Sequence, residues 1–111
     1  METLDRCRKL VESVLEDYAA IPYANGDYER ELVMDREKDR YLLLTLGWDG
    51  KRRVYYPVIH IDIHDGKLWI QHDATEDGVA KDLIAAGVPN KQIVLAFYPV
   101  EARRHSEFAV I

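Results

Sequence analysis

The fold turns on residues 58–72, which read VIHIDIHDGKLWIQH. Isoleucine fills every odd position from 59 to 63, and the even positions from 60 to 64 are His, Asp and His. Strict alternation of this kind predicts a strand with one buried face. Asp65-Gly66 predicts a hairpin turn directly after it, because these residues tolerate the positive φ that two-residue turns require. Residues 67–72 are then the returning strand.

Further strands lie upstream of this hairpin. Tyr41–Leu46 is a run of apolar and β-favouring residues that predicts a well-buried strand. Asp49-Gly50 predicts a second hairpin turn, after which Arg53–Tyr56 returns. Pro57 has no N–H for a ladder, so it marks a bulge, an edge or a strand break.

A more polar strand precedes these two. Asp27–Met34 mixes polar and apolar residues, with Tyr28 and Leu32 as the expected inward anchors. Asn25-Gly26 predicts the turn before this strand, and Asp35–Asp39 is a charged connector after it.

A helix is predicted at the start of the chain, from Leu4 to about Ala20, because Pro22 disfavours helix at the residue before it. Apolar residues recur there at steps of three and four, which places them on one stripe. The stripe consists of Leu4, Cys7, Leu10, Val11, Val14, Leu15 and Tyr18.

A second helix is predicted over Glu76–Ala86. Asp73 or Thr75 is its expected N-cap, and Gly87 is placed to end it. Its expected buried face consists of Val79, Ala80, Leu83 and Ile84.

The C-terminal part of the chain is predicted to close the sheet. Gln92–Tyr98 is strongly apolar and predicts a last strand. A basic-tinged loop, Pro99–Glu107, and an apolar tail, Phe108–Ile111, follow it. The whole pattern predicts an α+β fold with an N-terminal helix, a mostly antiparallel sheet of about five strands, a second helix before the last strand, and the helices packed on the sheet.

Length and composition exclude several classes of protein. A chain of 111 residues makes one domain, residues 1–111, because domains usually run to about 100–150 residues. It is 48% hydrophobic and 32% charged, which is typical of a soluble globular protein. The net charge of −5 argues against direct nucleic-acid binding, which depends on neutralising phosphates.

The chain carries no sign of export. Cys7 is the single cysteine, so no internal disulfide forms and the fold needs no oxidising compartment. The first residues are charged, without the apolar region of a secretory signal, and no apolar run approaches the roughly 20 residues of a membrane span. We therefore expect a cytoplasmic protein.

His60, Asp62 and His64 are the most distinctive candidates for chemistry. They share one face of a strand, and two imidazoles with a carboxylate suit zinc or a non-haem iron. The alternative is the outer face of an amphipathic strand, because same-face neighbours lie roughly 6.5–7 Å apart and do not converge on one ion. We favour this alternative, and expect no metal and no cofactor. The expected cross-strand pairs are His64 with Lys67, Asp62 with Trp69, and His60 with Gln71, while His72 is expected on the inward side.

Nucleophiles are poorly placed in the sequence. Ser13 lies on the first helix, and Ser106 follows His105 in an extended segment, where neighbouring side chains face apart. Cys7 lies on the apolar stripe and is interpreted as a core residue. We therefore expect no catalytic residues and no enzymatic activity.

Two basic patches remain, Lys51-Arg52-Arg53 at a hairpin tip and Arg103-Arg104-His105 in the last loop. Either could contact a phosphate or an acidic partner. Given the net charge of −5, we interpret both as solvated surface, and keep a direct DNA-binding accessory role as an alternative.

Several segments resemble the XisI family, the excision controlling factor associated with the fdxN element of heterocyst-forming cyanobacteria. The matching segments are 46–55 (LGWDGKRRVY), 59–63 (IHIDI), 66–72 (GKLWIQH), 87–89 (GVP), 93–97 (IVLAF) and 107–110 (EFAV). Their order and spacing match over essentially the whole chain. The sequence departs from the pattern at Pro57 and Ala96.

This resemblance implies a non-enzymatic accessory protein in the control of DNA element excision. It implies a companion, the XisH protein, which looks like a restriction-endonuclease-type fold, while a separate recombinase performs the recombination. A strand edge near Pro57 or the tail Phe108–Ile111 could supply the contact. The sequence leaves the oligomeric state open, a homo-oligomer included, and a metal-binding or hydrolytic protein built on His60, Asp62 and His64 stays the enzymatic alternative.

Overall fold

The computed structural model describes residues 3–22 and 27–111, so the turn expected at Asn25-Gly26 lies outside the described residues. In chain order the elements are α1 (Leu4–Ala19), β1 (Asp27–Asp35), β2 (Arg40–Asp49), β3 (Arg52–His64), β4 (Lys67–Asp73), α2 (Val79–Ala85), the 3-10 helix η1 (Asn90–Gln92), β5 (Ile93–Leu95) and α3 (Val100–Arg103). The five strands form one sheet in the order β1-β2-β3-β4-β5. Neighbours are antiparallel except β4 and β5, which run parallel.

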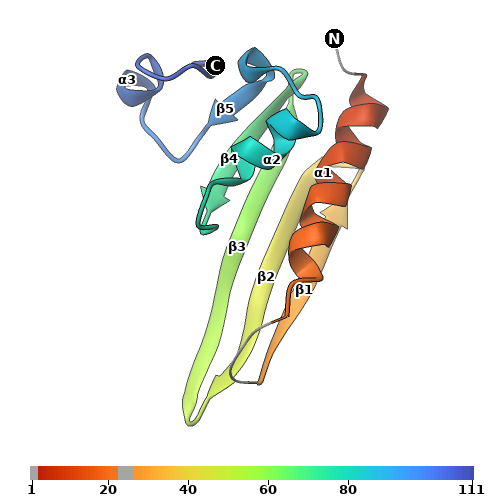
Figure 1. The fold of residues 1–111 in the computed structure, drawn as a ribbon, viewed down its shortest axis with the longest axis vertical. Helices are drawn as coiled ribbons and strands as arrows, with labels where there is room; N and C mark the ends of the chain where they lie inside the picture. The colour runs from red at the N-terminus through yellow and green to blue at the C-terminus, as the bar shows by residue number, and fades with distance from the viewer. Residues whose placement is uncertain (1–2, 23–26) are drawn as a thin grey trace.

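Helices α1 and α2 cover one face of the sheet, as Figure 1 shows, and this confirms the predicted α+β fold. The core lies between these two layers. Its fully buried members include Val11 and Leu15 of α1, Tyr41 and Leu43 of β2, Ile59 and Ile61 of β3, Leu68 and Ile70 of β4, and Leu83 of α2. The opposite face, called the outer face, carries the even positions of β3 from His60 to His64.

Both predicted hairpins form, one of them displaced. His64 pairs with Lys67, and Asp65 and Gly66 both have positive φ, 50° and 76°. In the other hairpin Asp49 pairs with Arg52, so the loop is Gly50-Lys51, one residue later than predicted. Gly50 has a φ of 62° and supplies the left-handed position itself.

Two bulges set the register of β3. Leu43 pairs with Ile59 but Leu44 pairs with Pro57, so Val58 is the extra residue and Pro57 marks a bulge, as expected. On the other side, Ile61 pairs with Ile70 but His60 pairs with His72, which leaves Gln71 as the extra residue. The predicted pair of His60 with Gln71 is therefore wrong. His72 is exposed and faces outward, because one extra residue moves a side chain to the other face of the strand.

Helix α2 begins three residues later than predicted. Gly78 precedes it with a φ of 88°, and one oxygen of the Asp73 carboxylate accepts the N–H of Val79 at 2.7 Å. The other oxygen accepts the N–H of Thr75, so Asp73 fixes the segment that leads into the helix. At the far end Gly87 has a φ of 109°, and the N–H groups of residues 87 and 88 bond the carbonyls of residues 84 and 83 in a Schellman motif.

Three residues expected to be buried are partly exposed. Leu4 is 47% exposed, and Leu32 and Ile84 are each 37% exposed. Leu4 lies in the first turn of α1, Leu32 on the edge strand β1, and Ile84 in the last turn of α2. All three positions lie at the margins of the two packed layers.

The C-terminal region is more folded than its sequence suggests. Strand β5 ends at Leu95, so Phe97 and Tyr98 of the predicted longer strand are exposed, and the loop after it contains α3. Ala109 is bridged in parallel to Val94, and its N–H donates to the carbonyl of Ile93 at 2.8 Å. Phe108 packs against the core. The tail is therefore part of the fold.

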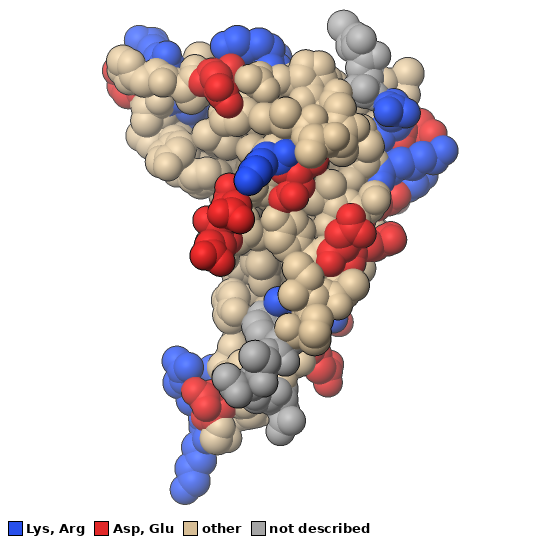
Figure 2. Space-filling view, viewed as in Figure 1, with Lys and Arg blue, Asp and Glu red and all other residues tan. Residues whose placement is uncertain are grey.

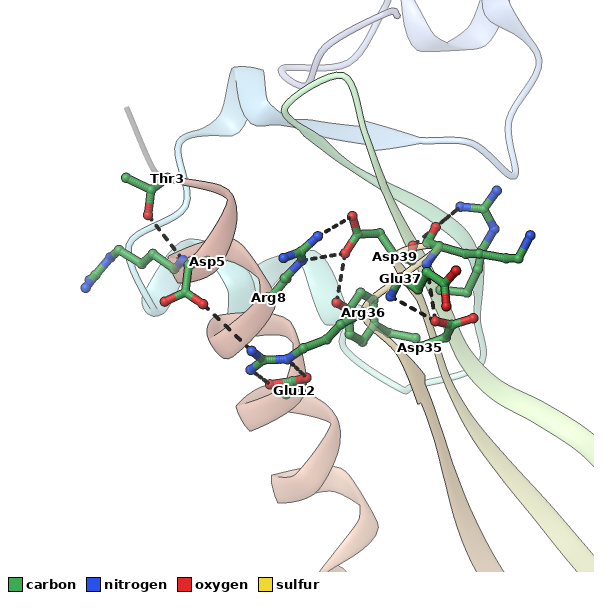
Figure 3. A network of polar contacts seen from close by, with 12 residues as sticks. Thr3, Asp5, Arg8, Glu12, Asp35, Arg36, Glu37 and Asp39 are labelled. Carbon is green, nitrogen blue, oxygen red and sulfur yellow. Dashed lines mark hydrogen bonds and ion pairs between the residues drawn. The ribbon is translucent and has the colours of Figure 1, made fainter.

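A polar network joins α1 to the turn between β1 and β2 (Figure 3). Arg8 donates two hydrogen bonds to the Asp39 carboxylate at 2.7 and 3.1 Å, and the Tyr41 hydroxyl donates a third at 3.0 Å. Arg36 donates two more to Glu12, at 2.8 and 2.6 Å. Hydrogen bonding from Arg8 holds the pKa of Asp39 below its usual range, and that from Arg36 does the same for Glu12.

The molecule is elongated, with extents of 45 × 30 × 24 Å. The hairpin of β2 and β3 extends past the end of α1 as a projecting arm, at the bottom of Figure 1. We use the term arm for β1–β3 beyond the level of Val58, with Gly50-Lys51 at its tip. No described helix is long and apolar enough to span a membrane.

Candidate functional site

The candidate cluster on β3 forms a small polar network on the outer face. His60 Nε2 lies 2.8 Å from Asp62 Oδ1, and Gln71 donates to the other oxygen of Asp62 at 3.3 Å. Arg40 of β2, which the sequence did not single out, lies opposite Asp62, with Nε 3.6 Å from the same carboxylate. Asp62 therefore has three polar neighbours from three strands.

His64 does not join this network. Its Nε2 lies 3.1 Å from Asp65 in the adjoining turn, and its ring stands edge-on to Trp69 at a centroid distance of 6.2 Å. Among the described residues no group of three or more His, Cys, Asp and Glu could hold a metal ion. The three candidate ligands of the metal alternative therefore separate into a His60–Asp62 pair and a distant His64.

The His60–Asp62 pair could orient an imidazole for proton transfer, but it needs a substrate group or a nucleophile beside it. The hydroxyl of Ser106 donates to the carbonyl of Arg103 and accepts the N–H of Phe108, which makes it part of the C-terminal turn. Cys7 is 2% exposed in the core, and Ser13 is exposed on α1. In the part of the chain that the structure describes, none of these three residues contacts the His60–Asp62 pair.

The two basic patches lie far apart. The hairpin tip with Lys51-Arg52-Arg53 is at one end of the long axis, and α3 is near the other (Figure 1). Arg53 stacks on Trp48 at 5.4 Å and Arg52 lies 3.3 Å from Asp49. The basic patch at the tip is therefore confined to three consecutive residues.

Arg103 has a structural role that the sequence did not indicate. Its guanidinium donates to the carbonyls of Tyr98, Val110 and Ala96 at 2.9, 3.1 and 3.4 Å. It also lies over the ring of Trp69 at 5.8 Å. Arg103 therefore ties the C-terminal segment to the outer face of β4, and Arg104 and His105 stay at the surface.

The structure separates the two contact regions that the sequence suggested. The tail is docked on β5 of its own chain, so it does not offer a free peptide. The edge near Pro57 is available in the described structure, because β4 pairs with β3 only from Ile59 to His64. Beyond Val58, whose carbonyl accepts the N–H of Ala74, β3 pairs only with β2 among the described residues.

The outer face of the arm is apolar and partly exposed. On this face Trp48 and Tyr55 of the arm are 54% and 62% exposed, and Val33 of β1, next to the arm, is 41% exposed. Leu44 on the same face is almost buried between its pairing partners Glu31 and Pro57, yet it lies outside the core cluster. Helices α1 and α2 lie on the opposite face of the sheet, so neither covers this face. An exposed apolar centre of this kind is typical of a protein contact surface.

Known proteins match the chain along nearly its whole length. The family model described as XisI protein matches residues 1–110. The chain is similar to the crystal structure of a XisI-like protein from Anabaena variabilis, with a TM-score of 0.92 and 35% identity over 98% of this chain and 100% of that one. It is also similar to the fdxN element excision controlling factor XisI from the same organism, with a TM-score of 0.86 and 30% identity over 99% of this chain and 100% of that one. No curated protein matches significantly.

Proposed function

Because the chain belongs to the XisI family, we propose that it is a controlling factor in the programmed excision of a DNA element. The observation that carries this proposal is the similarity to the excision controlling factor XisI, which extends over 99% of the chain at a TM-score of 0.86. The recombination itself belongs to a separate recombinase.

The proposed role is non-enzymatic. The His60–Asp62 pair has Gln71 and Arg40 as neighbours, and both lie on an open sheet surface with no nucleophile recorded among the described contacts. A surface that holds its polar groups in mutual hydrogen bonds suits recognition better than proton transfer. This arrangement supports a protein that acts by binding.

The partner we propose is a companion protein of the XisH kind, with a nuclease-type fold. Its contact surface is the outer face of the arm and of the adjoining part of β1, where Trp48 and Val33 are exposed. Large aromatic side chains with an apolar surround are the usual anchors of such contacts. The rim carries Glu29, Glu31 and Arg53, which would set the orientation of the partner.

The test begins with a tagged chain expressed in its native host. We expect one stoichiometric companion that resembles a nuclease, and expect the complex to re-form from the two purified proteins. The variant Val33→Asp with Trp48→Ala should lose the companion, and Ile84→Asp, on the helix side at similar exposure, should keep it. Recovery of metal or nucleic acid without a protein would overturn the proposal.

A second measurement concerns excision itself. In a strain that lacks this gene, the fraction of chromosomes with the excised junction should change and should return with the wild-type gene. If the excised fraction is the same with and without the gene, the chain serves another pathway.

A further inference from the structure

The outer face of the sheet has two adjacent columns of different character. Directly opposite residues of an antiparallel pair lie on the same face. On this face β1 supplies mostly acidic residues and β2 supplies leucines. The opposite pairs are Glu29 with Leu46, Glu31 with Leu44, and Val33 with Leu42. The leucine column continues to Trp48, which is 54% exposed, so an apolar column borders directly on an acidic one.

The two glutamates of the acidic column lack a cation in the described part of the chain. Glu29 and Glu31 are exposed, and neither carboxylate forms an ion pair with a described residue. The arginines of this face are engaged elsewhere. Arg40 lies 3.6 Å from a carboxylate of β3, and Arg53 stacks on an indole ring of β2 at 5.4 Å. A second copy packed face to face would bring the same acids and the same engaged arginines, so the missing cations point to a different partner.

The dimensions of the two columns fit a helix that lies along β2. Successive residues on one face of a strand are about 6.6–7 Å apart, so the distance from Leu42 to Trp48 is about 20 Å. A helix of about 14 residues has that length. Glu29 and Glu31 are likewise about 7 Å apart, close to the roughly 6 Å between residues four apart along a helix. Two basic residues at such positions can therefore reach both carboxylates.

The apolar surface is narrow, which favours a helix over a second sheet. Neighbouring strands lie about 4.8 Å apart, so the acidic column begins about 5 Å from the leucines. Two sheets packed face to face bury an apolar surface several strands wide, whereas a helix buries one stripe and carries charges beside it. On the β3 side the leucines are bordered by Tyr55 and Pro57, which extend the apolar surface and leave the acidic charge on the β1 side.

On the basis of the proposed function, we infer that the companion binds this face through an amphipathic helix. Its apolar stripe lies on the leucine column, and its basic flank lies on Glu29 and Glu31. The bound helix gives the sheet a layer on the face opposite α1 and α2. Figure 2 shows the helix-covered side, where acidic and basic side chains are intermixed over α1 and α2, as is typical of a solvated helix surface.

Removal of the two charges tests the basic flank. In calorimetric titration with the purified companion, Glu29→Gln with Glu31→Gln should weaken binding about tenfold and reduce its dependence on salt, because the screened contacts are then absent. Glu16→Gln with Asp17→Asn removes the same charge from the exposed side of α1 and should leave the affinity unchanged. If the Glu29 and Glu31 variant binds as the wild type does, the inference is wrong although the companion, and with it the proposed function, remains.

Zero-length cross-linking with a carbodiimide tests whether the bound element is a helix. The reagent joins a carboxylate to a lysine amine in contact with it, so Glu29 and Glu31 should link to lysines of the companion. Lysines three or four residues apart indicate a helix, and lysines two residues apart would indicate a strand and overturn the inference. The double variant with Gln at both positions should lose these products. A complex without cross-links at either glutamate would also contradict the basic flank.

A synthetic peptide probes the surface without the companion. A helical peptide of about 14 residues, with a leucine stripe and lysines along one flank, should bind the chain and displace the companion. The same peptide with glutamates in place of the lysines should not bind. Val33→Asp should abolish binding of the lysine peptide, and Ile84→Asp, at similar exposure on the helix side, should not. Equal binding of the two peptides, or binding that survives Val33→Asp, would refute the inference.

The state of the chain alone tests the competing occupant. Sedimentation should give a monomer, because the outer face awaits a basic partner. A dimer that Val33→Asp converts to a monomer would identify a second copy on this face and overturn the inference. Failure to recover any companion would overturn the proposed function and the inference together, whereas loss of the charge effect alone would overturn only the inference.

Discussion

Replacing Asp39 with Asn should remove the main electrostatic link between α1 and the sheet. Asp39 has a φ of 55°, a conformation that Asn and Asp both tolerate, so the substitution leaves the backbone preference in place. What changes is the charge that accepts two hydrogen bonds from Arg8 and one from Tyr41.

The expected loss follows from the burial of the pair. The side chains of Arg8 and Asp39 are 25% and 15% exposed, so solvent screens them only in part. Hydrogen bonds to charged groups contribute about 1.5–3 kcal/mol, and Asn still accepts one of them. We expect Asp39→Asn to lower the free energy of unfolding by about 2 kcal/mol.

Urea denaturation measures this loss, with Glu37→Gln as the control. Glu37 lies exposed in the same turn, and its neutralisation should change stability by less than about 0.5 kcal/mol. An unchanged m-value would show that the unfolded state is not the cause. A loss below about 0.5 kcal/mol for Asp39→Asn would refute the reasoning, because the pair would then behave as an ordinary surface ion pair.

The pH dependence separates charge from packing. The pKa of Asp39 is held below its usual range by the hydrogen bond from Arg8, so its stabilisation is present above the unfolded pKa and is lost as pH falls through the folded pKa. The difference between wild type and Asp39→Asn should therefore be constant near neutral pH and close below about pH 4. A difference that persists at lower pH would assign the loss to packing.

The remaining predictions concern the core, a cap, two phenols and the tail. Ile61→Ala should cost about 2–5 kcal/mol in urea denaturation, since Ile61 is fully buried. Gly87→Ala should cost about 1–2 kcal/mol by thermal melting, from backbone strain at a φ of 109° alone, because an added Cβ meets nothing within 4 Å. Desolvation raises the pKa of Tyr18 and Tyr41 to about 12, so stability should fall as pH rises from about 10 through 12, which urea midpoints across that range would show. Deleting Phe108–Ile111 should lower the melting temperature, because it removes Phe108 from the core and the Ala109 bridge, and an unchanged melting temperature would make the tail dispensable.

The elements with periodic sequence could be predicted, and their ends could not. The alternation at 59–63 correctly places three isoleucines in the core. The predicted start of α2 is wrong because residues 73–77 contain several residues suited to begin a helix, and only the folded chain shows Asp73 reaching over to Val79. The sequence offers several possible first residues for α2, and the contact between Asp73 and Val79 in the folded chain determines where the helix begins.

The displaced hairpin shows that the residues flanking a turn determine its position when two positions are possible. A loop at Asp49-Gly50 and one at Gly50-Lys51 both keep the same side chains on each face, since they differ by two residues in register. The observed loop pairs Leu46 with Tyr55, whereas the predicted one would pair Leu46 with Arg53. Apolar cross-strand pairing therefore favours the later turn, against the stronger Asp-Gly signal.

The candidate site depends on register and is only half predictable. Residues 60, 62 and 64 do share a face, but Arg40 lies opposite Asp62 because the bulge at Val58 shifts β3 against β2, and Gln71 contacts Asp62 from the bulge in β4. Bulges leave little trace in a single sequence, apart from a proline such as Pro57. The sequence therefore predicts that His60, Asp62 and His64 lie on one outer surface, but it does not predict the contacts of Arg40 and Gln71 with Asp62.

The open edge, by contrast, has a signal in the sequence that can be stated in general terms. Two consecutive hairpins share their middle strand, and its length is fixed by the two turns, Gly50-Lys51 and Asp65-Gly66. The returning strand must end where its apolar pattern ends, near Asp73, and seven residues cannot cover thirteen. The uncovered residues form an edge, and Pro57 on this edge has no N–H to donate to a partner strand. The spacing of the turns and the length of an apolar pattern can both be counted along the chain. Together they locate a strand that is longer than its neighbour, and the strand edge that is left unpaired.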